Sequence, residues 1–388
     1  MRILLLTHSF TPEISPPQRR WRAFVDAFAE AGHRVSVVTP RPQSQAPAEA
    51  IQQSRNVRVL RYPALFPATR PLFKALKHGI DSLVSIPSCL WAGRQDVVIA
   101  TVPALPTLLI GFVASKLLRA HFVVDLRDAW PNLLHESKVL GSSRLEPVVS
   151  RFILSLLKRA RLVVTVTQGL AAVARSQGVK NVITLPNGVE FGRYEGLQAP
   201  RREDSLVLNV LYLGNLGRSQ GLEVAIDAAA ALPGTIRLRM VGGGSEAEAL
   251  QEYAAHRGAA VEFHQPVRGI DVLKMYQWAD TCLVSLRPDW PSFDYTIPSK
   301  LYELLALDKH VTGLVRGEAA HIIEQAQAGA VVAQSAEALV SHLRSLGANR
   351  GSLLRTGSAR IWVKNNADLG SLGMKYLAEL EKLTENGR

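Results

Sequence analysis

The stretch "LNVLYLGNLGRSQGLEVAIDAA", residues 208 to 229, runs from an apolar strand through a turn with three glycines into a helical pattern. From this stretch outward in both directions, short runs rich in Val, Leu and Ile alternate with segments of helix length. Near-continuous apolar runs of this kind are typical of parallel strands that are buried on both faces. The sequence therefore predicts an α/β fold built on parallel sheets.

The predicted strands fall into two groups, on either side of a polar segment. The first group is RILLLTH, RVSVVTP, VRVLRYP, DVVIATV, HFVVDLRD, LVVTVTQ and VITLPNG, and the second is LNVLYLGN, IRLRMVG, VEFHQPV, TCLVSLRP, HVTGLVRG and AGAVVAQ. The segment between them, "GRYEGLQAPRREDSL" (192 to 206), lacks a sustained apolar period and is predicted to be a linker. A chain of 388 residues is too long for one ordinary hydrophobic core. We therefore expect two α/β domains, residues 1–195 and 196–370, and a C-terminal amphipathic helix, 371–388, for which packing back on the first domain is one option.

Composition is that of a globular protein, with 47% hydrophobic and 20% charged residues and no low-complexity tract, which excludes a disordered or fibrous chain. The N-terminal "MRILLLTHSF" has too short an apolar run for a signal peptide. The run "TVPALPTLLIGFVASKLL" (101 to 118) is too short to span a bilayer, and we expect a strand end followed by a buried helix. Cys89 and Cys282 are predicted to be buried free thiols in a reducing compartment, so the expected localisation is cytoplasmic.

The net charge of +12 belongs to the first half of the chain. Residues 1–200 hold 25 Lys and Arg against 12 Asp and Glu, whereas residues 201–388 hold 20 against 21. No basic arm or interleaved aromatic platform is present, so nucleic acid is not an expected partner. An anionic membrane surface and a phosphate-bearing substrate explain the basic half equally well. For the membrane, residues 70–86 are a candidate surface segment, with peripheral attachment to the inner face of the cytoplasmic membrane, and a buried helix is the alternative.

The loop after the first strand, "HSFTPEISPPQRRWRAF" (8 to 24), is a candidate site because ligands bind beyond the carboxyl ends of parallel strands. It lacks the G-x-G-x-x-G pattern of dinucleotide sites, which disfavours a dehydrogenase. Ser15 is a candidate helix cap. Arg19 and Arg20 are candidate contacts for an anionic substrate, and a solvated basic helix face is the alternative.

A second strand-end loop, "DLRDAWPN" (125 to 132), combines carboxylates, a guanidinium and an aromatic ring. Asp128 and Arg127 suit the orientation of a sugar hydroxyl or assistance in its deprotonation, and Trp130 offers a face on which a sugar can stack. The alternative is an Asp–Arg pair that only ties down the loop.

Two glycine-bearing turns follow strands in the second half. In the first, the backbone amides of Gly214 and Gly217 can hold a diphosphate, and Arg218 would neutralise it. In the second, "MVGGGSEAEAL" (240 to 250), the glycines let the backbone approach a ligand closely. Both are equally compatible with ordinary strand-to-helix turns.

A third segment, "FDYTIPSKLYELLALDKHV" (293 to 311), places a cation in the first turn of a predicted helix that starts at Pro298 or Ser299. A positive charge is locally unfavourable at a helix N-terminus, so Lys300 suggests an anionic ligand. Lys300 and Glu303 are also i, i+3 neighbours, and the alternative is a surface ion pair between them.

In order and spacing, these segments together resemble the GT-B glycosyltransferases of glycosyltransferase family 4, which are retaining enzymes. The resemblance runs nearly full length and is closest to bacterial members that build O-antigen, capsule and exopolysaccharide. It is carried by "TPEISPPQRRWRAFVDAFAEAGHRVSVVTP", "DLRDAWP", "VVTVTQGLAAVARSQG", "LPNGVEFGRY", "YLGNLGRSQGLEVAIDAA", "VGGGSEAEAL" and "IPSKLYELLALDKHV".

The resemblance implies two Rossmann-like domains that face a central cleft, the first binding the acceptor and the second a nucleotide-sugar, a UDP-sugar in preference to a GDP-sugar. It implies acceptor contacts at Ser15, Arg19, Arg20 and Trp130, and catalytic roles for Asp128, Arg127, Arg218 and Lys300. The implied donor-binding residues are Gly214, Asn215, Gly217, Arg218, Gly242, Gly243, Tyr295, Pro298, Ser299, Lys300 and Glu303. Of these, Lys300 would face the diphosphate and Glu303 the ribose.

The chain departs from the family pattern at four places. Tyr295 stands where relatives have an acid eight positions before Glu303, Ser15 to Pro17 replace a glycine pair, Gln220 replaces a basic residue, and Arg127 replaces a histidine. No Asp-x-Asp occurs, so neither a metal nor any other cofactor is expected to be required. The expected activity is transfer of a sugar to a lipid-linked or glycan acceptor in cell-surface polysaccharide biosynthesis. The alternatives are a GT-B nucleotide-sugar epimerase or hydrolase, and a non-catalytic nucleotide-sugar-binding protein at the membrane.

Overall fold

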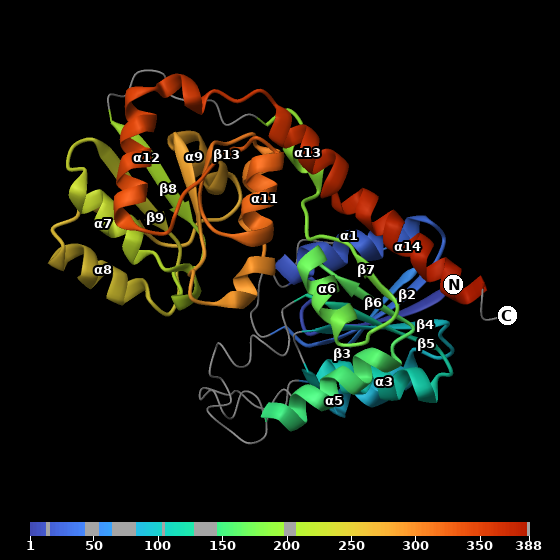
Figure 1. The fold of residues 1–388 in the computed structure, drawn as a ribbon. Coiled ribbons are helices and arrows are strands. Elements are labelled where there is room, and N and C mark those ends of the chain that lie inside the picture. The colour runs from blue at the N-terminus through green and yellow to red at the C-terminus, as the bar shows by residue number, and fades with distance from the viewer. Residues whose placement is uncertain are drawn as a thin grey trace. The chain divides into compact units, whose positions relative to one another are not determined.

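The computed structural model divides into two compact units, each built on one parallel sheet (Figure 1). Unit 1 comprises Met1–Asn187 and Leu369–Arg388, and unit 2 comprises Gly188–Asp368. The structure describes residues 1–12, 16–42, 54–63, 83–102, 105–127, 146–197 and 207–385. The α/β fold with two Rossmann-like parallel sheets is thus confirmed. The division lies at 187/188 and 368/369, rather than at the predicted 195/196 and 370/371, so described residues 192–197 of the expected linker belong to unit 2.

The sheet of unit 1 has seven parallel strands in the order β3-β2-β1-β4-β5-β6-β7. Every run that was predicted as a strand in the first half forms one. Their bounds are β1 Arg2–Leu6, β2 Arg34–Pro40, β3 Val57–Tyr62, β4 Val97–Val102, β5 His121–Leu126, β6 Leu162–Thr165 and β7 Val182–Thr184. β4 is buried at all six positions, as expected of a central parallel strand with helices on both faces.

Helices cover both faces of this sheet. Their bounds are α1 Pro16–Glu30, α3 Leu105–Leu117, α5 Glu146–Arg159, α6 Gln168–Ser176 and α14 Leu369–Glu385, and residues 83–91 are also helical. On one face α1 packs against α14, and Tyr376 of α14 meets Phe24 of α1 edge to face, with ring centroids 5.8 Å apart. On the other face, helix 83–91 and α3 share a core, and α5 lies beside α3. The chain's last helix is therefore an integral layer of unit 1.

The sheet of unit 2 has six parallel strands in the order β10-β9-β8-β11-β12-β13. All six runs predicted in the second half are strands. Their bounds are β8 Leu208–Leu213, β9 Ile236–Val241, β10 Val261–His264, β11 Thr281–Ser285, β12 Val311–Leu314 and β13 Gly329–Val331. The segment quoted first, residues 208–229, forms β8, the glycine turn and the start of α7.

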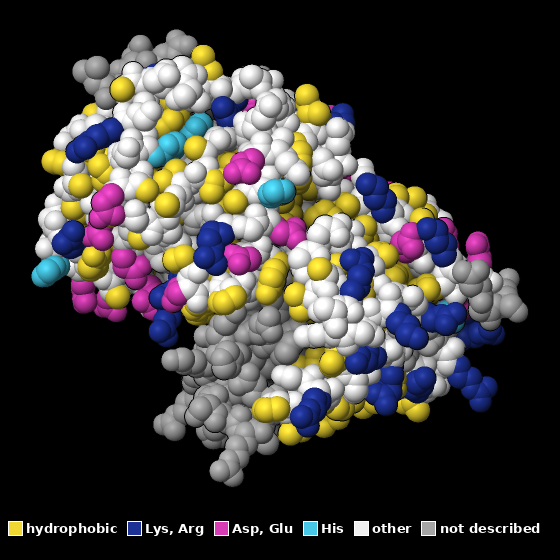
Figure 2. All heavy atoms as spheres, in the orientation of Figure 1, with side chains coloured by type: hydrophobic (Ala, Val, Ile, Leu, Met, Phe, Trp, Pro, Cys, Tyr) yellow, Lys and Arg dark blue, Asp and Glu magenta, His cyan; other side chains and the backbone are white. Residues whose placement is uncertain are grey.

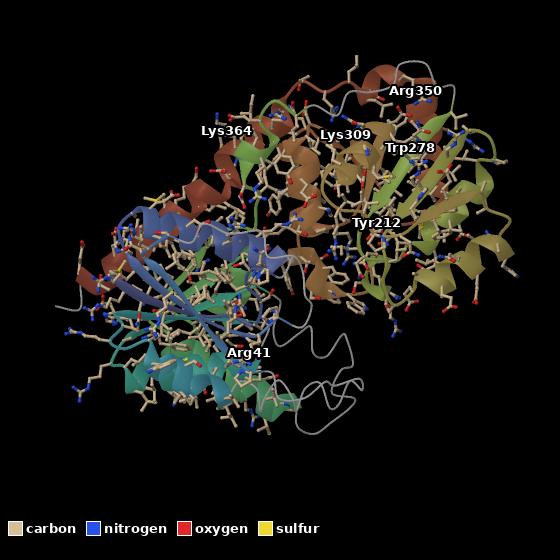
Figure 3. The ribbon with its side chains drawn as sticks, turned by 180° about the vertical axis from the view of Figure 1, so that it is seen from behind. Arg41, Tyr212, Trp278, Lys309, Arg350 and Lys364 are labelled. Atoms are coloured by element: carbon tan, nitrogen blue, oxygen red, sulfur yellow. The ribbon has the colours of Figure 1, made fainter. Side chains whose placement is uncertain are left out.

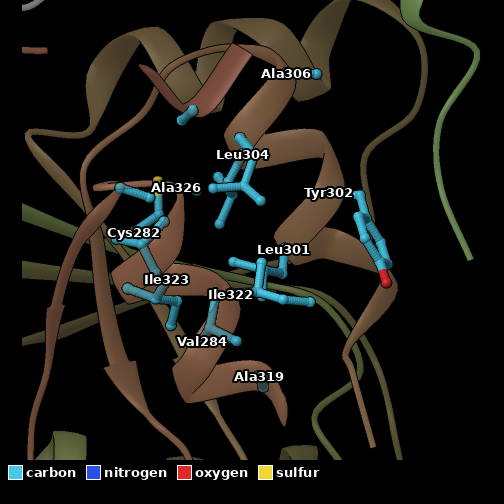
Figure 4. Close-up of a cluster of buried hydrophobic side chains, with 14 of the residues drawn as sticks. Cys282, Val284, Leu301, Tyr302, Leu304, Ala306, Ala319, Ile322, Ile323 and Ala326 are labelled. Carbon is cyan, nitrogen blue, oxygen red and sulfur yellow. The ribbon is translucent and has the colours of Figure 1, made fainter. Parts of the chain in front are cut away.

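Unit 2 carries α7 Glu223–Ala231, α8 Ala247–His256, α9 Ile270–Trp278, α10 Ser299–Ala306, α11 Gly317–Gln325, α12 Ala336–Ala348 and α13 Ser358–Asn366. Short 3-10 turns lie at Phe191–Tyr194, Arg218–Gln220, Pro291–Tyr295 and Arg350–Leu353. The predicted apolar face of α10 is confirmed, since Leu301, Leu304 and Leu305 are at most 2% exposed. Figure 4 shows Leu301 and Leu304 pointing towards Ile322 and Ile323 of α11. This packing fixes the position of the α10 N-terminus.

Both cysteines are buried free thiols, as predicted. Burial raises the pKa of the Cys282 thiol to about 12, so it stays protonated at neutral pH. In the described part of the chain, no helix is long and apolar enough to cross a membrane.

Buried polar groups line the amino ends of β11 and β12. Lys309 donates to the carbonyl oxygen of Ala279 at 2.7 Å, and Arg350 pairs with Asp280 at 2.9 Å. Figure 3 labels Lys309 and Arg350 towards one end of the unit 2 sheet and Tyr212 towards the other. These cations therefore stabilise the edge of the sheet opposite the carboxyl ends of its strands.

The same edge predicts a loss of stability in acid. His310 Nδ1 lies 2.8 Å from Thr281 Oγ1, and burial lowers the pKa of His310 from 6.5 to about 3. Below pH 6.5 the unfolded chain binds a proton that the folded chain does not, so stability is complete above that pH and falls as the pH approaches 3. We expect a loss of about 2 kcal/mol between pH 7 and pH 5 from this group.

The test compares melting temperatures at pH 7 and pH 5 for the wild type and His310→Asn, whose amide can still bond Thr281. The variant is expected to melt lower at pH 7 but to lose less between the two pH values. An equal loss in both proteins would remove His310 as the source.

Candidate functional site

The connections of the unit 2 sheet reverse direction between β8 and β11. From β8 the chain proceeds outward to β9, and from β11 it proceeds the other way to β12. Ligands of open parallel sheets bind at such a switch point, outside the carboxyl ends of the strands. The segments that meet there are 214–222 after β8 and 286–298 after β11.

The two glycine-bearing turns form one continuous backbone surface. The amide of Gly214 donates to the carbonyl of Val241 at 3.0 Å, and that of Leu216 donates to Gly243 at 2.9 Å. A Cβ atom at Gly242 would lie 1.8 Å from the carbonyl oxygen of Gly214, and the backbone there has φ +153°. Only glycine fits this contact, so Gly242 is required by the packing of one turn against the other.

Within the first turn, the side chain of Gln220 holds the backbone through two hydrogen bonds. Its Oε1 accepts from the amide of Gly217 at 3.2 Å and from Asn215 Nδ2 at 3.4 Å. A Cβ atom at Gly217 would collide with the Asn215 amide at 2.4 Å. Arg218 opens the 3-10 turn with its side chain exposed, and Asn215 is exposed as well. The turn is thus held rigid by internal hydrogen bonds while Arg218 faces solvent. The amides of Gly214 and Gly217, which were predicted to hold a diphosphate, instead donate to Val241 and to Gln220 Oε1.

The structure adds Arg287 and Asp289 to this edge. The Arg287 amide donates to Ser219 at 3.0 Å, and its guanidinium pairs with Asp289 through Nε and Nη2 at 2.8 and 2.9 Å. The hydrogen bond from Arg287 lowers the pKa of Asp289 below its usual value, and the more distant charge of Arg218 acts in the same direction. Sequence reasoning missed Arg287, although "TCLVSLRP" places it directly after a predicted strand, where ligands of parallel sheets bind.

At the start of α10, the ion pair expected as the alternative is present. Lys300 Nζ lies 2.9 Å from Glu303 Oε2, with the lysine side chain 32% exposed and the glutamate side chain 9%. The hydroxyl of Tyr276, from α9, donates to the same Oε2 at 3.4 Å. Burial, and then the charge of Glu303, raise the pKa of Tyr276 well above its usual value, so it remains a donor. The buried Tyr276 therefore fixes Glu303, and Lys300 is partly exposed to solvent.

The segment that leads into α10 is held by α11. Asp294 pairs with Arg316 Nη2 at 3.0 Å, and a Cβ atom at Gly317 would collide with the Asp294 carbonyl at 1.8 Å. Tyr295 ends the 3-10 turn and is half-buried. Pro298 is the N-cap residue, and α10 begins at Ser299 with no side-chain cap. In the first turn of α10, the amide of Leu301 donates to the carbonyl of Pro298 at 3.0 Å.

In unit 1 the structure corrects the prediction for Arg20. Its side chain is 2% exposed, with Nη1 donating to Pro186 at 2.5 Å and Nη2 to Leu185 at 3.0 Å and lying 3.4 Å from Asp125. A buried cation of this kind ties α1 to β5 and to the chain after β7. Arg20 is therefore a structural residue rather than a contact for acceptor at the surface.

The other predicted residues of unit 1 are only partly placed. Arg127 Nη2 donates to Asn187 Oδ1 at 3.2 Å, just after the carboxyl end of β5, and Arg19 is exposed on α1. Asp128, Trp130 and Ser15 lie outside the described residues. No group of three or more His, Cys, Asp or Glu residues suited to a metal ion occurs within the described ranges.

Two family models match the chain, one over each unit. A "Glycosyl transferase 4-like domain" matches residues 17–188, and "Glycosyl transferases group 1" matches residues 208–349. The chain belongs to glycosyltransferase family 4. This glycosyltransferase has the GT-B fold, uses a nucleotide-sugar, and is a member of a retaining family.

A curated relative of this glycosyltransferase is WcaI of Escherichia coli (strain K12), whose name describes a glycosyl transferase of colanic acid biosynthesis. It is 26% identical over 373 residues, which are 89% of this chain and 91% of the relative. Anabaena HepE in complex with UDP-glucose superposes with a TM-score of 0.72 at 16% identity, covering 98% of this chain and 100% of that one. Sucrose-phosphate synthase of Thermosynechococcus elongatus superposes with a TM-score of 0.75 at 17% identity, covering 99% of both chains. These solved structures share the fold.

Proposed function

We propose that this glycosyltransferase binds a UDP-sugar at the switch point of unit 2 and transfers the sugar, with retention, to a lipid-linked or glycan acceptor held by unit 1. The observation that carries the proposal is that three features follow strands at the same edge of one sheet: the two packed glycine turns, the cations Arg218 and Arg287, and the α10 N-terminus with Lys300. The cations and the helix N-terminus suit a diphosphate, and the glycine turns leave room for it beside the backbone.

In this proposal the leaving group is a nucleoside diphosphate, and the chain's main task is to stabilise the negative charge that develops on it. Preorganised donors and cations act strongly in such a role because they need no reorganisation during the reaction. Gln220 and Ser219 hold the turn that presents Arg218, and Glu303 holds Lys300 in place. The ammonium of Lys300 has three donors, so it can keep Glu303 while it binds a phosphate oxygen. The groups that position Arg218 and Lys300 are therefore already hydrogen-bonded before the donor binds.

The acceptor class and the pathway are supported by the relatives. WcaI is named for colanic acid biosynthesis, and a lipopolysaccharide outer core galactosyltransferase, WaaB, shares the fold with a TM-score of 0.66 at 13% identity. The structure of HepE with UDP-glucose supports uridine as the base of the donor. We therefore propose a step in the assembly of a cell-surface polysaccharide.

The first test measures the melting temperature with UDP, GDP, UDP-glucose and GDP-mannose at saturating concentration. A ligand present at 100 times its Kd stabilises the folded state by about 2.7 kcal/mol. We expect a rise of about 5 °C or more with the uridine compounds and a smaller one with the guanosine compounds. A larger rise with GDP would overturn the choice of base.

The second test follows the release of UDP from UDP-sugars with and without a lipid extract. Release that needs the extract, together with labelled sugar in the lipid fraction, supports transfer. Rapid release or epimerisation without any acceptor would replace the proposal with the hydrolase or epimerase alternative.

A further inference from the structure

One face of unit 1 is apolar where a folded protein's surface is usually polar. Seven large apolar side chains on helix 83–91, α3 and α5 are 36% exposed or more, namely Leu83, Leu90, Trp91, Leu109, Leu117, Val148 and Phe152. In the described ranges, the five other exposed side chains of this kind are spread over the rest of the chain. Exposed apolar residues scattered singly are normal, whereas a cluster marks an interaction site.

The exposed residues form one stripe on each helix. Leu83, Leu90 and Trp91 follow the helical period of residues 83–91, and Val148 and Phe152 are i, i+4 neighbours on α5. Because helix 83–91 and α3 share a core and α5 lies beside α3, the three stripes belong to neighbouring elements on one face of the sheet. As expected, residues 101–118 form the end of β4 and then a helix, α3, which buries Leu108, Ile110 and Ala114 on one side and leaves Leu109 and Leu117 exposed on the other. We call helix 83–91, α3 and α5 the apolar face of unit 1.

The charge around the apolar face is mostly positive. Exposed cations lie on or directly after the three helices, at Arg94, Lys116, Arg119, Arg151, Lys158 and Arg159. The sequences of the three helices contain a single acid, Glu146. Figure 2 shows apolar and basic side chains next to each other over the part of unit 1 where Figure 1 draws α3 and α5. A cationic rim around apolar side chains complements an anionic lipid surface, which offers negative headgroups above a hydrocarbon layer.

We propose that the apolar face of unit 1 docks on an anionic bilayer, with Trp91 and Phe152 inserted among the acyl chains and the basic side chains bound to headgroups. Trp is favoured at the boundary between headgroups and hydrocarbon, and Trp91 is 76% exposed. Long basic side chains lay their stems on apolar surface and keep the charge at the headgroups. The face lies outside the donor site, so the proposal goes beyond the proposed function. Of the membrane segment expected at 70–86, only residues 83–86 are described, and they belong to this face.

The experiment measures co-sedimentation of the full chain with vesicles of phosphatidylcholine alone or with about one third phosphatidylglycerol. We expect binding to the anionic vesicles only and a loss of binding at high salt. Each cation near an anionic surface contributes about fivefold to the partition coefficient. Arg151→Gln with Lys158→Gln should therefore lower the partition coefficient on anionic vesicles by about 25-fold. Trp91→Ser with Phe152→Ser should also lower the partition coefficient on these vesicles.

Matched controls come from unit 2. Ile361→Ser removes an apolar side chain that is 63% exposed on α13, and Arg344→Gln removes an exposed cation on α12. Neither should change vesicle binding. Wild-type binding that is equal on both vesicles, or variants that match these controls, would overturn the proposal. So would a wild-type dimer, seen by sedimentation velocity, that the Trp91→Ser, Phe152→Ser variant lacks, since the face would then bind a second copy.

The melting-temperature rise with UDP, measured on the same variants, separates this proposal from the proposed function. An unchanged rise shows that each variant is folded and that its donor site is intact. If UDP fails to stabilise the wild type while vesicle binding follows the pattern above, the donor proposal fails and the docking proposal stands.

Discussion

Gly242→Ala is expected to abolish stabilisation by UDP and to lower the melting temperature by about 10 °C. The new Cβ would lie 1.8 Å from the carbonyl oxygen of Gly214, and the backbone at φ +153° is one that L residues rarely adopt. The two glycine turns must separate, which strains the residue by about 1–3 kcal/mol. This separation also weakens or breaks the hydrogen bonds from Gly214 to Val241 and from Leu216 to Gly243, each of which contributes about 1 kcal/mol.

Gly243→Ala is the matched control, one residue along the same turn. Its Cβ would meet only Pro266, with Cγ at 3.4 Å and Cδ at 3.9 Å, which are ordinary contacts, so the melting temperature without UDP should change by no more than about 2 °C. Differential scanning fluorimetry with and without UDP provides both readings. If the two variants behave alike, the contact between the turns is not what shapes the site.

The strands were predictable because the strands of a parallel sheet that is buried on both faces consist of unbroken runs of apolar residues. "DVVIATV" became β4, buried at all six positions, and "TCLVSLRP" became β11, buried at all five. No pairing information was needed to locate them. The domain limit was harder to place, since the chain leaves unit 1 at Asn187 within "LPNGV", which has no composition shift, and not in the polar stretch that follows.

Arg20 was misread for a physical reason. Two adjacent arginines at the start of a helix are typical of a solvated basic face, and Arg19 is indeed exposed. Arg20 is buried because its partners arrive from far along the chain, at Asp125, Leu185 and Pro186. Local periodicity carries no information on such partners, so the sequence alone could not separate the two side chains.

Lys300 and Glu303, at the start of α10, also show what local spacing in the sequence cannot predict. The i, i+3 spacing of Lys300 and Glu303 predicted either an ion pair on the helix surface or a ligand site. Both interpretations rest on the same two residues, so the spacing could not distinguish them. The structure adds that Glu303 is fixed by Tyr276 from α9, which makes the pair asymmetric, with a buried acid and a half-exposed base. A pair that served only as a surface brace would not need the acid to be buried.

Lys300→Ala is accordingly expected to lower kcat by about 10²–10³-fold, the usual loss when one preorganised group that stabilises developing charge is removed. Lys300→Arg should recover part of that loss, because the charge is kept while its position shifts. Glu303→Ala should also cut transfer, since it leaves the Tyr276 hydroxyl without its acceptor and Lys300 without its anchor. Rates are measured as labelled sugar transferred from UDP-sugar to the lipid extract.

The control is a second i, i+3 pair in the same unit, Asp271 and Lys274 on α9, with a separation of 2.8 Å and both side chains more than half exposed. Lys274→Ala removes a surface ion pair worth at most about 0.5 kcal/mol and should leave transfer unchanged. Lys300 and Lys274 thus have the same spacing from their acidic partners, but the partner of Lys300 is buried and the partner of Lys274 is exposed. Unchanged turnover in both Lys300→Ala and Glu303→Ala would show that this pair, too, is only a brace, and the donor diphosphate would have to be held by Arg218 and Arg287 alone.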